Sequence, residues 1–407
     1  MRRVGREIGP SGNRDIGRHH FIEDCNLVSS SPDLSRLAVD PILKARVLYI
    51  AYPLLTVSEK SAGGAEQVLW TLELEMARHG LKTAVAASAG SCVTGELLST
   101  GDSCFQLDDF GRRNCEHQER ILEMIQCRAS RGRAFDLVHD MSGSFWSRAG
   151  EIDAPVLATL HLPRDFYSSV LFEDIPANVK FNCVSRSQAH SFADLRQLAG
   201  VVNNGIGLDR FAPNLQQKER SGLLWLGRIC QEKAPHLALD IAEQAGMSIT
   251  LAGQVYPFSH HQQYFDRELA PRLQRMPGAR FIDHPAQQQK QQLLCNARAV
   301  LVTSLVEETS CLVAMEAAAS GTPVIAFGHG ALPEIVRHGV TGFVVEELRA
   351  AVQILEQLQQ IDPVVCICHA RDHFTSARMA EGYLDLYQRV LESENRELPQ
   401  MNAETRR

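Results

Sequence analysis

The segment Glu307–Glu334, with the sequence EETSCLVAMEAAASGTPVIAFGHGALPE, constrains the fold of this chain more than any other. Its apolar and small residues are typical of a helix, with Thr309 or Ser310 as the N-cap. Val324–Phe327 follows as an apolar run short enough for a buried parallel strand. Gly328-His329-Gly330 comes next, at the carboxyl end of that strand, where open α/β sheets bind their ligands. The segment therefore predicts a binding site at the edge of a sheet.

Two glutamates in this segment can serve such a site. Glu308 and Glu316 are eight positions apart. On one helix they would lie roughly 80° apart around the axis and about 12 Å apart along it. We therefore expect them to reach two parts of one extended polar ligand. A carboxylate suits a vicinal diol, because each oxygen accepts one O–H.

Strand-like and helix-like runs alternate from about residue 46 onward, which predicts a parallel α/β architecture. The pattern restarts after the turn-rich Asn203-Asn204-Gly205. Two halves of similar layout favour two Rossmann-like domains with a ligand cleft between them. The predicted strands are Arg46–Ala51, Thr83–Ala87, Leu137–His139, Val156–Thr159, Phe181–Val184, Leu223–Leu226, Ile249–Ala252 and Val300–Thr303.

Composition limits the function classes. The 407 residues include 41 basic and 48 acidic side chains, a net charge of −7 without long blocks of one sign. This balance indicates neither a nucleic-acid partner nor binding to an anionic membrane surface. No apolar run approaches the roughly 18 to 20 residues that span a bilayer, so we expect no transmembrane segment.

The 11 cysteines form no Cys-x-x-Cys pair and no zinc-like spacing with histidine. Cys366-x-Cys368 is isolated, and we assign no metal to His260-His261 or to His19-His20. We expect a reduced, cytoplasmic protein.

The segment also resembles a known family. The two glutamates, the EA that follows, G-T-P-V and G-x-x-P-E are similar to the donor-site signature of glycosyltransferase family 4, the group 1 glycosyltransferases. The resemblance implies the GT-B fold, in which two Rossmann-like parallel-sheet domains face a central cleft. We expect an acceptor domain over residues 46–204 and a donor domain over residues 205–375. The helix at about 376–391 would pack back onto the first domain, and residues 1–45 and 392–407 would be flexible.

The resemblance also implies roles for charged residues. Arg228 and Lys233, in GRICQEK, would bind the diphosphate of a nucleotide sugar. Fixed cations there would stabilise the charge that develops on the leaving group. Glu308 would hold sugar hydroxyls, and Glu316 the ribose hydroxyls. His161, after the strand ATL, would contact the donor sugar, while His139 could either line the cleft or be structural.

Backbone groups complete the implied site. Gly63 and Gly64, in the GGAE loop, would line the cleft from the acceptor side, and Gly330 and Ala331 would offer backbone N–H groups to sugar or phosphate. The family commonly has Gly-Phe-Gly after the first glutamate, where this chain has Thr309-Ser310-Cys311. These three residues are assigned to donor binding, and the difference puts the donor sugar's identity in question. An Asn204-Gly205 hinge is expected, with Gly207 in place of the usual aspartate.

The implied activity is retaining transfer of a hexose from a UDP- or GDP-sugar to an acceptor hydroxyl, with no cofactor and no metal. The catalytic residues would be Glu308, His161, Arg228 and Lys233. Two alternatives stay open: a nucleotide-sugar-binding protein without transfer activity, and a GT-B phosphorylase or epimerase. The acceptor could be a glycan, a lipid or a small metabolite, and the oligomeric state is open.

Overall fold

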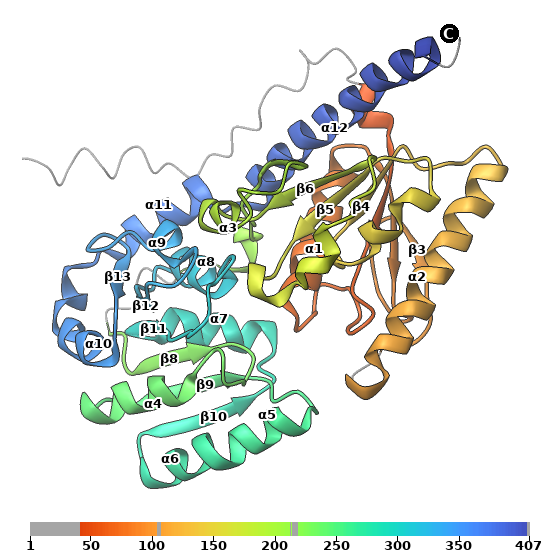
Figure 1. Ribbon diagram of the computed structural model, residues 1–407. Coiled ribbons are helices and arrows are strands. Elements are labelled where there is room, and N and C mark those ends of the chain that lie inside the picture. Colours follow the sequence, from red (N-terminus) through yellow and green to blue (C-terminus); the bar gives the residue numbers. More distant parts are fainter. Residues whose placement is uncertain (1–40, 104–106, 212, 214–218, 405–407) are drawn as a thin grey trace, which may run out of the picture. The chain divides into compact units, whose positions relative to one another are not determined.

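The computed structural model describes residues 41–103, 107–211, 213 and 219–404. Their strands form two separate parallel sheets, shown in Figure 1. The first sheet has seven strands in the order β3-β2-β1-β4-β5-β6-β7. These are β1 Arg46–Ile50, β2 Lys82–Ala87, β3 Glu96–Ser99, β4 Leu137–Asp140, β5 Val156–Leu160, β6 Val179–Cys183 and β7 Leu198–Val201.

The second sheet has six strands in the order β10-β9-β8-β11-β12-β13. In both sheets the order reverses next to the first strand, at β1 and at β8, which is the topological switch point where such sheets bind ligands. The strands are β8 Leu223–Leu226, β9 Ile249–Gly253, β10 Ala279–Asp283, β11 Ala299–Val302, β12 Val324–Phe327 and β13 Gly342–Val345.

Helices connect the strands, as parallel pairing requires. With the first sheet are η3 Pro41–Lys44, α1 Gly64–Arg78, α2 Leu107–Ser130, η4 Phe145–Glu151, η5 Arg164–Phe166, η6 Ser169–Phe172 and α3 Arg186–Ser191. Between the sheets in sequence is η7 Leu208–Arg210. With the second sheet are α4 Pro235–Gln244, α5 Ser259–Tyr264, η8 Phe265–Leu269, α6 Ala270–Arg275, α7 Gln287–Asn296, α8 Leu312–Ala319, α9 Leu332–Ile335, α10 Leu348–Ile354, η9 Leu355–Gln360 and α11 Pro363–His373, and α12 Ser376–Glu404 follows.

The first sheet is buried on both faces. Val47 and Tyr49 of β1 belong to one apolar cluster with α1 and α12, whereas Leu48 and Ile50 belong to another with α2 and η4. Successive side chains of a strand point to opposite faces, so an uninterrupted apolar run serves both layers. The predicted run at Arg46–Ala51 reads as a buried parallel strand for this reason.

In the second half, the signature forms helix α8, which is buried from Ala314 to Ala319. Met315 and Ala317 are at most 1% exposed, and Glu316 between them is only 2% exposed. Gly321 follows the helix with φ +68°, a left-handed conformation that suits glycine after a helix end. β12 is also buried throughout. The signature therefore forms part of the core of the second sheet and presents its polar groups at one edge.

Helix α12 packs against α1 and the first sheet (Figure 1). The hydroxyl of Tyr387 on α12 lies 2.7 Å from Nδ1 of His139, and Nε2 of His139 lies 2.7 Å from Oγ1 of Thr159. Both ring nitrogens are thus occupied in the interior, where burial lowers the pKa of His139 well below its ordinary value. Of the two roles considered for His139, the structural one fits this geometry.

Two boundaries differ from expectation. Residues 41–45, placed with the N-terminal extension, include η3 and bury Ile42 and Ala45 in the core. α12 continues to Glu404, past the expected end at 391. The predictions for residues 1–40 and for His19-His20 lie outside the described residues. Within the part that the structure describes, no helix is long and apolar enough to cross a membrane.

Candidate active site

The loop after β8 carries Arg228 and Lys233. At its end Ala234 has φ +47°, an uncommon conformation for a residue with a Cβ. The Oγ1 hydroxyl of Thr303, just past β11, donates to the carbonyl oxygens of Ala234 (2.9 Å) and Lys233 (3.2 Å) and holds this turn. The neighbouring strand thus fixes the backbone from which Lys233 projects.

Lys233 meets the first signature glutamate. Its Nζ lies 2.5 Å from Oε1 of Glu308, and the Oγ hydroxyl of Ser304 donates to the same oxygen. Glu308 is 7% exposed. Burial disfavours the charge on Lys233, but the Glu308 carboxylate outweighs burial and raises the pKa of the ammonium. Lys233 is therefore a permanent cation at the edge of the second sheet.

Gly330 and Ala331 lie against the same glutamate. Glu308 and Gly330 form an isolated β-bridge, and the backbone N–H of Ala331 donates to the Glu308 carbonyl at 2.6 Å. Gly330 has φ +63°, and a Cβ there would lie 2.3 Å from the Glu308 carbonyl oxygen. Only glycine permits this approach.

The helix of the signature begins later than expected. α8 starts at Leu312 with Cys311 as N-cap, and neither Thr309 nor Ser310 caps it. Glu308 therefore lies in the preceding loop, and the angular separation calculated for two glutamates on one helix is wrong. The prediction failed because the Glu308–Gly330 bridge holds this stretch extended, which local capping preference does not reveal. The two carboxylates still lie at opposite ends of one loop-helix segment.

Glu316 has a partner that the sequence analysis missed. Nζ of Lys290, on α7, lies 2.5 Å from Oε1 of Glu316. The side chains are 13% and 3% exposed. Oε2 of Glu316 is buried and has no hydrogen-bond partner among the described residues. Lys290 is the one charged residue in the sequence of α7, QQQKQQLLCN, and that isolation was the available signal.

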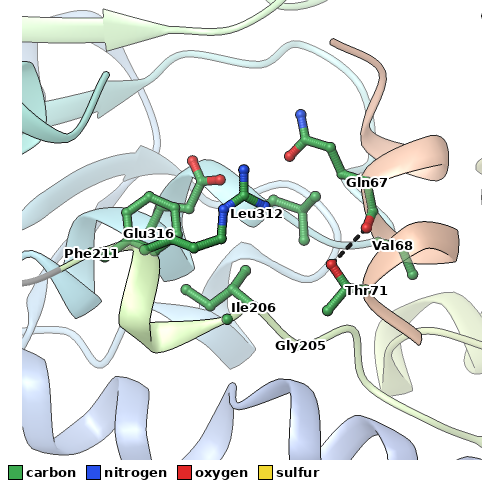
Figure 2. Close-up of a pocket in the computed structure, with 10 residues that line it drawn as sticks. Gln67, Val68, Thr71, Gly205, Ile206, Phe211, Leu312 and Glu316 are labelled. Atoms are coloured by element: carbon green, nitrogen blue, oxygen red, sulfur yellow. Dashed lines mark hydrogen bonds between the residues drawn. The ribbon is translucent and has the colours of Figure 1, made fainter. Parts of the chain in front are cut away.

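The Glu316 side chain lines a pocket, which Figure 2 shows. Gln67, Val68 and Thr71 of α1 form one wall, and Leu312 and Glu316 of α8 form the other. Its remaining lining comes from the segment that joins the two sheets, Gly205, Ile206, Gly207, Arg210 and Phe211. Gly205 also packs closely on Thr375, because a Cβ there would lie 2.3 Å from the Thr375 carbonyl oxygen.

His161 follows β5 in the first half. Its carbonyl oxygen accepts a hydrogen bond from Thr309 Oγ1 at 2.8 Å, so it adjoins the loop of the first signature glutamate. Its Nε2 is buried without a partner in the described part of the chain. Burial lowers the pKa of His161 to about 4. The imidazole is therefore neutral at pH 7 and can donate or accept one hydrogen bond.

The GGAE loop opens helix α1. A Cβ on Gly64 would approach Leu312 of α8 to 3.8 Å, so this glycine faces the signature helix. A Cβ on Gly63 would overlap the Glu66 carboxylate. Glu66 is 5% exposed, and burial raises its pKa to about 7. Tyr256 belongs to the second half. Burial raises the pKa of its phenol, and the negative charge of Glu66 raises that pKa as well.

The remaining predicted residues take these places. Arg228 is exposed, with its guanidinium 5.8 Å from the centroid of the Tyr256 ring. Cys311 is buried, and burial raises the pKa of its thiol to about 12, so it is no nucleophile at neutral pH. Ser310 Oγ is buried and lacks a hydrogen-bond partner among the residues described.

Glu334, the last residue of the signature, was assigned no role. Its carboxylate accepts from the backbone N–H groups of Ser187 (2.6 Å) and Arg186 (3.1 Å) at the start of α3. A residue of the second half thus caps a helix of the first. Together with the Thr309–His161 bond, it brings the two β-sheets' loops into contact.

Known proteins resemble this chain in sequence and in fold. Residues 220–361 match the family model described as Glycosyl transferases group 1. A D-inositol 3-phosphate glycosyltransferase of Streptomyces scabiei is 28% identical over 255 residues, which cover 52% of this chain and 57% of the relative. The chain thus spans about half the length of the curated relatives it matches.

Solved structures show the same fold. AviGT4, a glycosyltransferase involved in avilamycin A biosynthesis, superposes with a TM-score of 0.65 at 22% identity, covering 86% of this chain and 98% of that one. Anabaena HepE in complex with UDP and glucose gives a TM-score of 0.65 at 17% identity over 84% and 98% of the chains. The expected GT-B fold is confirmed. The chain thus has two Rossmann-like sheets in the GT-B arrangement, and its residues 220–361 are similar to the group 1 glycosyltransferases.

Proposed function

We propose that this chain is a retaining hexosyltransferase that uses a nucleotide diphosphate sugar and needs no metal at the reacting bond. The observation that carries the proposal is the Lys233–Glu308 pair, whose loop is joined through Thr309 to the backbone of the neutral His161. Together they offer a cation, a carboxylate and an uncharged imidazole, which suit a diphosphate, sugar hydroxyls and a sugar, respectively.

The leaving group sets the electrostatic requirement. As the bond from the sugar C1 to the diphosphate oxygen breaks, negative charge grows on that oxygen. Lys233 and Arg228 lie on one loop and would stabilise it, each charge-assisted hydrogen bond contributing about 1.5–3 kcal/mol. The N-terminus of helix α8 adds fixed partial positive charge, whereas the N–H of Ala331, predicted to face the ligand, donates to the Glu308 carbonyl instead.

Retention follows from chemistry on one face of the sugar. The acceptor oxygen forms its bond to C1 on the side from which the diphosphate departs, and the departing phosphate oxygen takes the acceptor's proton. Bonds and protons balance without an enzyme nucleophile, which is consistent with the unreactive thiol of Cys311. His161 and Glu308 would orient the sugar through its hydroxyls.

The nucleotide end would bind at Glu316. Lys290 donates to Oε1 of this buried carboxylate, which leaves Oε2 for a ribose hydroxyl. UDP is the donor nucleotide we favour, because a structure of the same fold, HepE, holds UDP and glucose. The acceptor hydroxyl belongs to a glycan, a lipid or a small metabolite.

The test is nucleotide release from UDP-, GDP- and ADP-hexoses by the purified chain, with and without a mixture of candidate acceptors and in the presence of EDTA. Glu316→Ala and Lys233→Ala should each lower turnover at least about 100-fold, the usual loss when a preorganised transition-state contact is removed. Lys82→Ala, on an exposed residue at the start of β2, is the control. Donor binding without turnover would indicate a binding protein, and unchanged turnover in both variants would refute the site.

A further inference from the structure

A second group of chemically reactive side chains lies beside the proposed diphosphate loop. Cys230 and Glu232 belong to that loop, and His261 belongs to α5. Each offers one ligand atom, and these three atoms all lie within 4.8 Å of one another. Cys230 and His261 are buried, and Glu232 is half-buried. The fold thus assembles a thiol, a carboxylate and an imidazole from positions 31 residues apart or less.

The buried imidazole of His261 indicates that this cluster binds a ligand. Its side chain is 2% exposed, and Nδ1 is buried with no hydrogen-bond partner within the described ranges. A buried polar atom without a partner costs about 1–3 kcal/mol, so such atoms call for an explanation. The ring is held by aromatic neighbours, with centroids 5.3 Å from Phe258 and 4.4 Å from His260. The imidazole therefore packs among aromatic rings with its Nδ1 unused by any described residue.

We propose that Cys230, Glu232 and His261 bind a zinc ion. Thiolate, imidazole and carboxylate are the ligands that Zn²⁺ takes in proteins, whereas Mg²⁺ and Ca²⁺ prefer oxygen alone. Tetrahedral Zn²⁺, with bonds of about 2.0–2.3 Å, places its ligand atoms roughly 3.3–3.7 Å apart. The side chains need only close by about 1 Å, which small rotations supply.

The site has an open side. Glu232 and His261 line a cavity together with Gln231, His260 and Leu305. Two of the three proposed ligands therefore face this cavity, and three protein ligands leave a fourth position on a tetrahedral ion for water or another small ligand. Zinc here would join the loop after β8 to α5, and that loop carries Arg228 and Lys233 on either side of the ligands. The metal would hold the proposed diphosphate loop in place without contacting the reacting bond. Its role would be structural and separate from the transfer reaction.

The experiment uses the full chain, freed of metal by chelation and then titrated with Co²⁺ and with Zn²⁺. Cobalt bound by a thiolate gives a charge-transfer absorption that oxygen and nitrogen ligands alone do not. We expect one equivalent of Co²⁺ to produce this band and Zn²⁺ to abolish it by displacement. Zn²⁺ affinity is measured in parallel by competition with a chromophoric chelator.

Variants assign the ligands. Cys230→Ser should remove the charge-transfer band, and His261→Gln or Glu232→Gln should weaken Zn²⁺ binding by at least about 100-fold, since even second-layer changes cost 10- to 100-fold. Cys127→Ser and His284→Ala, on exposed residues elsewhere, should bind as the wild type does. Far-UV circular dichroism checks that each variant is folded, and Glu232→Gln keeps the side-chain size if a buried variant fails. A wild type without the band, or a band that survives Cys230→Ser, overturns the proposal. Neither result depends on transfer activity.

Discussion

At the scale of single residues, the buried carboxyl of Glu66 gives a signed prediction. Burial raises its pKa from 4.5 to about 7, so between these values the folded state binds a proton that the unfolded state has lost. Stability therefore falls as pH rises through this window, by up to roughly 3 kcal/mol. Glu66→Gln, which stays neutral, should lack this fall. Urea unfolding at pH 5 and pH 8 checks it, and equal pH dependence in both proteins would contradict it.

The Lys290–Glu316 pair is the second residue-scale case. Both groups are largely buried, so removing Lys290 leaves a carboxylate without its counter-charge. Lys290→Met should lower the free energy of unfolding by about 3–5 kcal/mol. The double variant Lys290→Met, Glu316→Gln should recover much of that loss, because it removes the charge as well. Thermal and urea unfolding of both variants measure the difference; a double variant as unstable as Lys290→Met alone would argue against the pair.

At the scale of elements, α12 is tied to the first sheet by a polar contact in an apolar layer. The Tyr387 hydroxyl lies 2.7 Å from His139 Nδ1 and donates to the Tyr49 hydroxyl at 3.2 Å. Tyr387→Phe should cost about 1–3 kcal/mol of stability, because buried partners lose a hydrogen bond. Nucleotide affinity should not change, since the residues that we propose to bind the nucleotide all belong to the second half. Calorimetric melting together with nucleotide titration separates the two effects.

The same scale shows which elements the sequence could specify. Strands such as Arg46–Ile50 and Val324–Phe327 were predicted because both of their faces are apolar. β3 Glu96–Ser99 and β7 Leu198–Val201 were not, since these end strands are short and partly exposed and carry no apolar pattern. The start of α8 was missed because the Glu308–Gly330 bridge is a contact between distant positions.

The residues of the site also fall into a group that the sequence predicted and a group that it did not. Glu308, Glu316 and Lys233 stand in a local pattern whose spacing can be read along the chain, and the structure brings Lys233 to Glu308. Lys290, by contrast, reaches Glu316 from another helix. The fold brings His261 of α5 next to Cys230 and Glu232, with β9 between them in sequence. The spacing of the three residues along the chain therefore does not predict this cluster. Local motifs were predictable, and groups assembled by packing were not.

At the scale of the whole molecule, Glu334 of the second half forms hydrogen bonds with the first half. Its carboxylate caps α3, whereas the nucleotide-binding residues that we propose all belong to the second half. Glu334→Ala should therefore leave nucleotide affinity within about twofold and reduce sugar transfer about tenfold, which corresponds to roughly 1.4 kcal/mol in the transition state. The loss would arise because His161 is no longer held firmly opposite Glu308. Glu347→Ala, on an exposed glutamate of the same half, is the matched control. Titration with UDP and initial rates with the best donor supply the two measurements, and a parallel fall in affinity and rate would show that Glu334 acts on nucleotide binding instead.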